Sequence, residues 1–197
     1  ITKKNKIKDL IEFGRGFQNT TQLFILKKMV KSGDISIEAK INFSEDGSIL
    51  KDYVIDGDLE NVKLRLLNKD IIENIKFAFI LKDKDFVIYN ASSFYQDIKF
   101  KSDEIRIKEK DSAFLFNGNI STSKNDLNLK VISKIFQLDL GIIENDKILF
   151  SSNNKFSFKL SKKFKFSNIN ANSKFNIESL EYSNSSLKEF FPGYING

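Results

Sequence analysis

Apolar and polar residues alternate along most of this chain, and this period of two is the feature that most limits how it can fold. The cleanest stretch runs from Gly33 to Phe43, where every second residue is apolar and the residues between are polar. Successive side chains of a β-strand point to opposite faces of a sheet. The stretch is therefore predicted to be a strand with one apolar and one polar face.

The same alternation recurs along the chain and predicts about eleven to thirteen short strands. Residues 75–81 and 86–90 form a predicted hairpin around a turn at 82–85, and residues 45–48 are a second turn signal. Apolar positions change parity between Leu59 and Val62, which predicts a β-bulge near Glu60–Asn61. Further strands are predicted around residues 94–100, 105–107, 114–120, 127–131, 148–150, 156–160, 164–166 and 175–177.

Three segments interrupt the alternation and are predicted to be short helices. The first is capped by Asn19 or Thr20 and is closed by Gly33, and the second runs from Ser185 or Ser186 to Phe191, before Pro192–Gly193. The third, residues 131–138, also fits a strand pattern, and a short helix is favoured there.

These patterns predict an all-β, mainly antiparallel fold with one to three short helices. No linker or low-complexity stretch divides residues 1–197, which we expect to form a single β-rich segment of a longer repetitive protein. A curled single sheet with an apolar groove fits the alternation, and a β-sandwich or a β-solenoid fits it too. The phrases Ile55–Leu59 and Phe116–Ile120 resemble each other around a central glycine, which is interpreted as relieving a bend or bulge.

The residue inventory excludes much of the usual enzyme chemistry. The chain has no Cys and no His, so disulfides, thiol nucleophiles, imidazole bases and Cys- or His-based zinc sites are impossible. Carboxylates cluster at 83–85 and 144–146 without the pattern of a calcium loop, and both segments are interpreted as turns. We therefore expect no catalytic residue, no metal and no cofactor; a glycosidase that uses only carboxylates is the weakest alternative.

Net charge and hydropathy give little evidence about binding partners. The formal net charge is +6, but the charged residues are interspersed and no nucleic-acid partner is expected. Phe residues and Lys residues mix at 155–166, yet period two places Phe156 and Phe158 on one face and the polar residues on the other. Apolar runs reach only about five residues, as at 77–81, so no membrane-spanning helix is predicted.

The apolar strand faces supply the candidate site. If the sheet is open, these faces line a groove suited to acyl chains; if it is closed, the same residues form an ordinary core. The candidate lining residues are Ile35, Ile37, Ile41, Phe43, Ile75, Phe77, Phe79, Leu81, Ile88, Phe114, Phe116, Phe156 and Phe158.

Several phrases resemble the AsmA-like family of the Gram-negative envelope. They are a short helix leading into Gly33–Ile37, the phrase Val54–Val62, the phrase Phe114–Ile120, and the closing Leu187–Gly197, which looks like the start of that family's next unit.

The resemblance implies a segment of a periplasmic lipid-conduit protein, anchored in the inner membrane by a segment outside this chain. Such a protein carries phospholipids between the inner and outer membranes, or supports outer-membrane assembly, and its partners are phospholipid acyl chains and the two membranes. The alternative function is a structural or adhesive extracytoplasmic β-protein with a closed, Phe-rich core.

Overall fold

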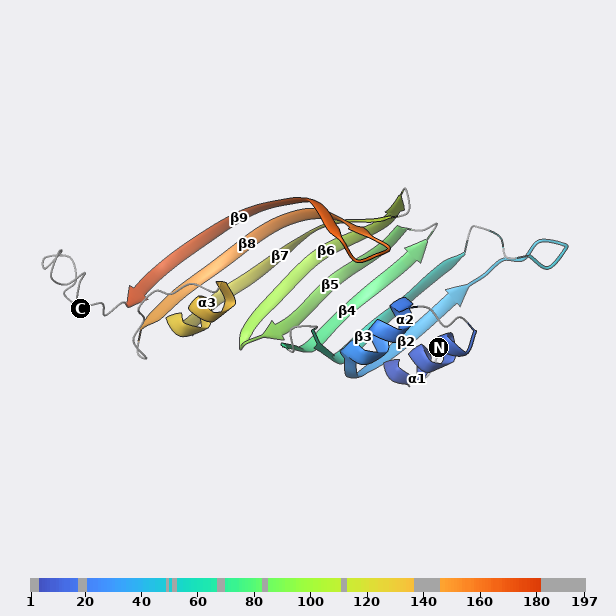
Figure 1. Cartoon of the computed structure of the whole chain (residues 1–197), viewed down its shortest axis with the longest axis horizontal. Helices are drawn as coiled ribbons and strands as arrows, with labels where there is room; N and C mark the ends of the chain where they lie inside the picture. The colour runs from blue at the N-terminus through green and yellow to red at the C-terminus, as the bar shows by residue number, and fades with distance from the viewer. Residues whose placement is uncertain are drawn as a thin grey trace, which may run out of the picture. The chain divides into compact units, whose positions relative to one another are not determined.

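Nine strands form one open sheet in which neighbours along the chain are also neighbours in the sheet (Figure 1). The computed structural model describes residues 4–17, 21–48, 50, 53–66, 70–82, 85–110, 113–136 and 146–181. Its strands are β1 (Asn5–Lys6), β2 (Val30–Lys40), β3 (Val54–Arg65), β4 (Ile71–Lys82), β5 (Asp85–Tyr95), β6 (Ile98–Lys110), β7 (Ala113–Asn128), β8 (Lys147–Ser161) and β9 (Phe166–Glu181). Pairing from β1 to β6 is antiparallel throughout. This arrangement confirms the all-β, mainly antiparallel single sheet and differs from the sandwich and the solenoid.

The strands are fewer and longer than the alternation predicted. Residues 114–120 and 127–131 were expected as separate strands, but β7 runs unbroken through Asn128; β8 likewise joins 148–150 to 156–160. Residues 94–100 were expected as one strand, but a turn at Gln96–Asp97 divides them between β5 and β6. Polar residues inside long strands cause the first error, because a period-two signal fades wherever both faces carry polar side chains.

The described residues cluster into two compact units. The first contains those within residues 1–120 and 154–172, and the second contains those within 121–153 and 173–197. Each unit is described by itself below.

A row of β-bulges crosses three adjacent strands of the first unit. Asn61 in β3, Asn74 in β4 and Asn90 in β5 have positive φ angles of 53°, 49° and 53°. At each asparagine the pairing register shifts, so that two residues of one strand oppose a single residue of its neighbour. The bulge predicted near Glu60–Asn61 is confirmed. Asparagine suits these places because it adopts the left-handed conformation more readily than most residues.

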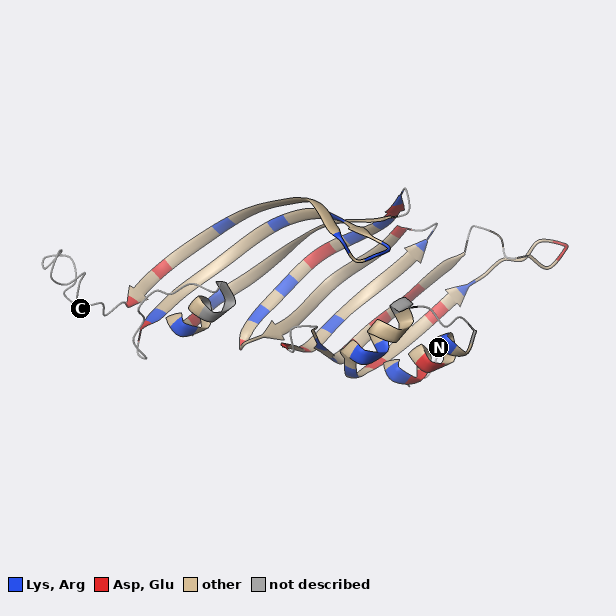
Figure 2. Ribbon diagram, viewed as in Figure 1, with Lys and Arg blue, Asp and Glu red and all other residues tan. Residues whose placement is uncertain are grey.

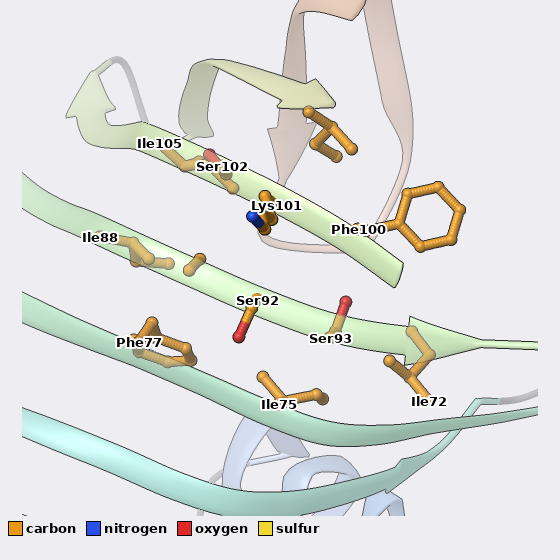
Figure 3. A pocket seen from close by; sticks show the side chains of 12 residues that line it. Ile72, Ile75, Phe77, Ile88, Ser92, Ser93, Phe100, Lys101, Ser102 and Ile105 are labelled. Carbon is orange, nitrogen blue, oxygen red and sulfur yellow. The ribbon is translucent and has the colours of Figure 1, made fainter. Parts of the chain in front are cut away.

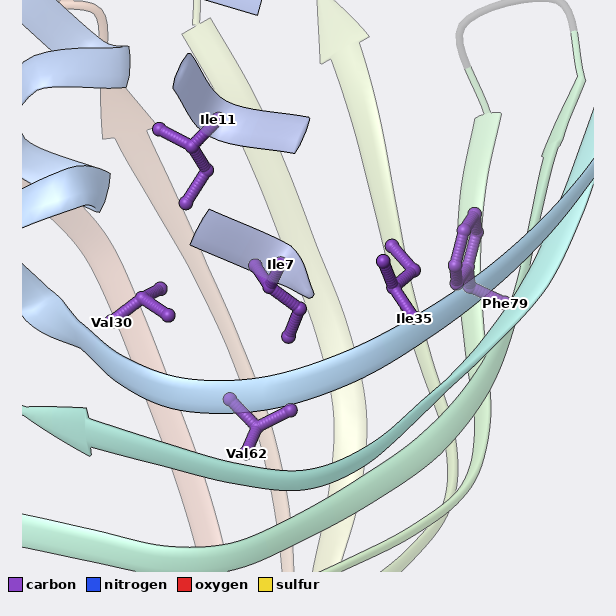
Figure 4. Packing of buried hydrophobic residues seen from close by; sticks show 6 residues of the cluster. All are labelled: Ile7, Ile11, Val30, Ile35, Val62 and Phe79. Carbon is purple, nitrogen blue, oxygen red and sulfur yellow. The ribbon is translucent and has the colours of Figure 1, made fainter. Parts of the chain in front are cut away.

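Helix α1 (Ile7–Phe17) packs on β2 and covers this part of the sheet. Its Ile7 and Ile11 are one helical turn apart and, together with Val30, Ile35, Val62 and Phe79, form the buried core (Figure 4). Figure 4 shows these side chains on the inner side of the bend that β2 and β3 make. Each large side chain that is buried in this way contributes about 1.5–3 kcal/mol.

The helix predictions had mixed outcomes. Helix α2 (Thr21–Met29) and helix α3 (Leu129–Phe136) confirm the first and third expected helices. Helix α1 was not predicted, although Ile7, Leu10 and Ile11 have helical spacing. The helix expected at 185–191 lies outside the described residues, as do Asp83 and Glu144–Asn145 of the two carboxylate turns.

Gly33 does not close a helix, and that prediction was wrong. Helix α2 ends at Met29, and Gly33 lies inside β2 with a φ of 144°. A Cβ atom at this position would lie 2.8 Å from both Ile7 Cδ1 and Val62 Cγ2. The glycine therefore makes room for α1 to pack on the sheet, which is a demand of tertiary packing and not of helix termination.

Residues 41–48 and Leu50 extend beyond β2 as a small hairpin. The Leu50 N–H donates to the Asn42 carbonyl at 2.9 Å, and the expected turn at 45–48 is present. Hydrogen bonds from the Ser44 hydroxyl and from Ser48 lower the pKa of Asp46 to about 2. Among the described residues, no helix is long and apolar enough to cross a membrane.

Candidate functional site

One face of the sheet in the first unit is apolar across five adjacent strands. The register places Ile37 of β2 opposite Gly57, which lies opposite Phe79, then Ile88 of β5 and Ile105 of β6. Residues directly opposite each other in neighbouring strands share a face. A parallel row contains Ile35, Leu59 and Phe77, and another contains Ala39, Ile55, Leu81, Phe86 and Ile107. We call this surface the apolar face.

The bulges keep this face apolar along the full length of the strands. In β5, Phe86 and Ile88 have even numbers, whereas Ala91 and Ser93, beyond the bulge at Asn90, have odd numbers. One extra residue restores the inward direction of the side chains after the sheet has bent. Without the extra residue at Asn90, Ala91 and Ser93 would point to the polar face and Ser92 would point to the apolar face.

A shallow apolar pocket lies in the apolar face between β4 and β7 (Figure 3). Its volume is about 210 Å³. The lining residues are Ile72, Ile75, Phe77, Ile88, Ala91, Ser92, Ser93, Phe100, Lys101, Ser102, Ile105 and Ile120. Isoleucine and phenylalanine dominate this lining, so the pocket can accept an apolar group but offers little for a strongly polar one.

Burial divides the apolar face into two regions. Next to α1, Ile35 and Phe79 are only 8% and 6% exposed and belong to the core. Around the pocket, Ile75, Phe77, Ile88 and the other large apolar side chains are half-buried. The described helices α1 and α2 contact β2 and β3 and do not extend over the pocket strands, so these side chains keep part of their surface exposed.

Hydroxyl groups lie among the apolar side chains of the pocket. The register places Ser93 opposite Phe100 on the apolar face, whereas Ser92 lies opposite Lys101 on the other face, and Figure 3 shows the two serine side chains pointing to opposite sides of β5. The buried Ser102 hydroxyl donates to Asn119 Oδ1 at 3.2 Å. Near the same end of β5, Tyr95 donates to Asp70 Oδ2 at 2.9 Å, and burial together with this carboxylate raises the pKa of the Tyr95 phenol.

Aromatic side chains continue the apolar surface onto β7 and β8. The rings of Phe116 and Phe158 are stacked with centroids 4.6 Å apart, and Phe156 stacks on Phe158 at 5.9 Å. Phe166 lies 5.4 Å from Phe158. Aromatic ring contacts of this kind add to the stabilisation that area burial alone provides.

The opposite face of the same strands is polar. Asp85 Oδ2 lies 3.4 Å from the Arg106 guanidinium and 3.3 Å from Lys108 Nζ, in a hollow that Ile80 and Val87 also line. Figure 2 shows acidic and basic residues interleaved along β6. Neighbouring residues such as Val87 and Ile88 therefore lie in different surroundings.

The sequence-predicted lining residues fall into three groups. Ile35, Ile37, Ile75, Phe77, Phe79, Leu81 and Ile88 share the apolar face; Ile35 and Phe79 belong to the core, and Ile37, Ile75 and Phe77 pack against it. Phe116, Phe156 and Phe158 form the aromatic cluster, and Phe114 has the same parity as Phe116 in β7. Ile41 and Phe43 lie beyond the end of β2 in the hairpin, 39% and 62% exposed.

Sequence reasoning missed Ile72, Ala91, Phe100, Ile105 and Ile120 as pocket residues. It placed Phe94 and Phe100 in one strand, but the register puts Phe94 opposite Lys99 and Phe100 opposite Ser93, on different faces. The asparagines at 74 and 90 were the available signal, because asparagine is common at positive φ. Parity alone fails wherever a bulge or a tight turn intervenes.

Among the described residues, no group of carboxylates is arranged to hold a metal ion. Comparison with known proteins gives no further guide, since no protein family, no curated protein and no solved structure matches this chain.

Proposed function

We propose that this chain binds lipid acyl chains on its apolar face, as a segment of a longer protein that conducts phospholipids between the inner and outer membranes of a Gram-negative envelope. The observation that carries the proposal is the half-buried apolar surface around the pocket, since the two helices of the first unit, α1 and α2, contact β2 and β3 instead. An acyl chain is flexible, apolar and uncharged, and it gains from contact with such a surface without needing any placed polar group.

The construction of the sheet supports passage as well as binding. The backbone N–H and C=O groups of interior strands pair with each other, so a sheet presents side chains and few free polar groups to a ligand. Rows of Ile and Phe extend from β2 to β6, and the cluster around Phe158 lies further along the same unit. An acyl chain that leaves one row of Ile and Phe side chains meets another apolar row, while the lipid headgroup stays in water.

The alternative is a structural or adhesive protein in which these residues form a dry core. Residues of a closed core are almost fully buried, as Phe79 is here. Ile88, Phe77 and Ile75 are instead half-buried. The alternative requires another protein layer over them, and the test below discriminates between a lipid and a protein cover.

The proposal is tested by placing a photoreactive amino acid at position 88 and, separately, at position 87. Ile88 lines the pocket and Val87 faces the polar side of the same strand, so the two probes share everything except the face. The expected result is a phospholipid adduct from position 88 in cells or with phospholipid vesicles, identified by mass spectrometry, and a much lower yield from position 87.

Two results contradict the proposal. Equal lipid yields from both positions mean that the contact is non-specific, and adducts with protein alone at position 88 support the closed core. Circular dichroism of both variants verifies that the sheet is retained.

A further inference from the structure

The last strand, β9, has an edge that no described strand pairs with. The sheet order places β8 on one side of β9 and no described element on the other. Every residue of β9 is exposed, including Phe175, Ile177 and Leu180, which are 56%, 58% and 56% exposed. An edge of this length carries a row of unpaired N–H and C=O groups that can form backbone hydrogen bonds with another strand.

The residues of this edge do little to prevent such pairing. Natural edge strands are commonly protected by proline, by several lysines or by shortness. Ser173–Glu181, the part of β9 in the second unit, contains no proline and only one lysine, Lys174. The residue of β9 with a positive φ angle, Asn168, lies before Ser173, so Ser173–Glu181 has no such residue to twist the edge away from a partner strand.

We propose that Ser173–Glu181 pairs antiparallel with the same segment of a second copy of this chain, with Asn176 on the two-fold axis. In this register Phe175 lies opposite Ile177 of the second copy, and Lys174 lies opposite Glu178 of the second copy. Two-fold symmetry repeats both pairs, so one register gives two apolar pairs and two opposite-charge pairs. Moving the axis by one residue to position 175 or 177 places Lys174 opposite Asn176 or Leu180 and loses the charge match.

Charge complementarity therefore favours a second copy over an unrelated strand. Glu178 already lies 2.7 Å from Lys124 of its own chain, which holds its carboxylate on a defined side of the sheet. Lys174 and Glu178 are four residues apart and point to the same face, as the register requires. Pairing of sheet edges is a recurrent mode of recognition in which backbone bonds give affinity and side chains select the register.

The absence of cysteine from the sequence makes a direct test possible. In the 197-residue chain, Asn176→Cys introduces one thiol, which lies on the axis opposite its symmetry mate, whereas Lys174→Cys puts two thiols about 13 Å apart along the strands. We expect a disulfide-linked dimer under mild oxidation from the first variant and not from the second. Sedimentation of the unmodified chain should show a reversible dimer.

A charge swap tests the register without a covalent link. Lys174→Glu places like charges opposite each other twice and should weaken the dimer about tenfold. The double variant Lys174→Glu with Glu178→Lys restores opposite charges and should recover most of the affinity.

The proposal is overturned if the chain sediments as a monomer and Asn176→Cys forms no dimer, or if both cysteine variants are linked equally well. Protection of the β9 amides from hydrogen exchange in a monomer also overturns it, because another part of the same chain then covers the edge.

Discussion

At the residue scale, Gly57 and Gly118 are required because a neighbouring strand approaches too closely to leave room for a side chain. A Cβ atom at Gly57 would lie 2.2 Å from the Ser36 carbonyl oxygen and 3.0 Å from the ring of Phe79, its cross-strand partner. At Gly118 the corresponding Cβ would lie 2.8 Å from the Glu104 carbonyl oxygen. The two similar phrases in the sequence thus share a physical reason: glycine lets a neighbouring strand pack closely over it.

Substitution of Gly57 by alanine is expected to lower the free energy of unfolding by about 1–3 kcal/mol, because the added methyl group overlaps with backbone and not with a flexible side chain. The matched control is Gly16→Ala in α1, where a Cβ meets nothing within 4 Å. That variant should be unchanged or up to about 1 kcal/mol more stable, since alanine is the better helix former. Urea unfolding of both variants measures the difference, and equal effects would contradict the close approach at Gly57.

At the scale of the element, the three bulges decide how β3, β4 and β5 bend. Asn61, Asn74 and Asn90 are all exposed, so their side chains add little to the core. Their contribution is conformational: each supplies a left-handed residue at the point where its strand changes register. Bulges bend a strand and increase its twist. The apolar face follows this bend without interruption.

The conformational role of Asn74 predicts opposite results for two substitutions. Asn74→Gly should change stability by less than about 0.5 kcal/mol, because glycine adopts a positive φ without strain. Asn74→Val should destabilise the chain by about 2 kcal/mol, because a β-branched residue is strongly disfavoured in the left-handed region. Thermal and urea unfolding distinguish them; a harmless valine would show that the bulge is not needed.

At the scale of the whole molecule, the apolar face has two roles: its buried side chains form the core, and its half-buried side chains line the pocket. Phe79 was predicted from its parity to line a groove, and the structure places it in the core, stacked on Phe86 at 5.3 Å. A charge at Phe79 would unfold the sheet, because an unpaired charge cannot be buried there. Ile88 and Ile105 line the pocket with part of their surface exposed, and they are the positions where function can be tested apart from stability.

If lipid binds the pocket, it must stabilise the folded chain, because a ligand that binds only the native state shifts unfolding by mass action. Dodecylphosphocholine below its micelle concentration is expected to raise the free energy of unfolding by about 2.7 kcal/mol at one hundred times its dissociation constant. Ile105→Asn should reduce this increase, and Lys108→Asn, on the polar face of the same strand, should not. Equal increases in both variants would place binding elsewhere.

The sequence by itself determined the class of fold and much of the apolar face. Alternation in β2 and β4 identifies Ile35, Ile37, Phe77 and Phe79 as one face, because side chains alternate in any strand. The parity change near Asn61 was equally visible, since apolar residues had to return to the same side. These features are local, and local sequence is sufficient to predict them.

Only the tertiary structure decided which apolar residues are core and which line the pocket. Packing of α1 buries Ile35 and leaves Ile88 half-exposed, and nothing in the alternation of either strand marks that difference. Gly33 looked like a helix end because its real neighbours, Ile7 and Val62, are distant in sequence. The reason is physical: burial depends on which other element covers a face, and period two specifies the face without specifying its cover.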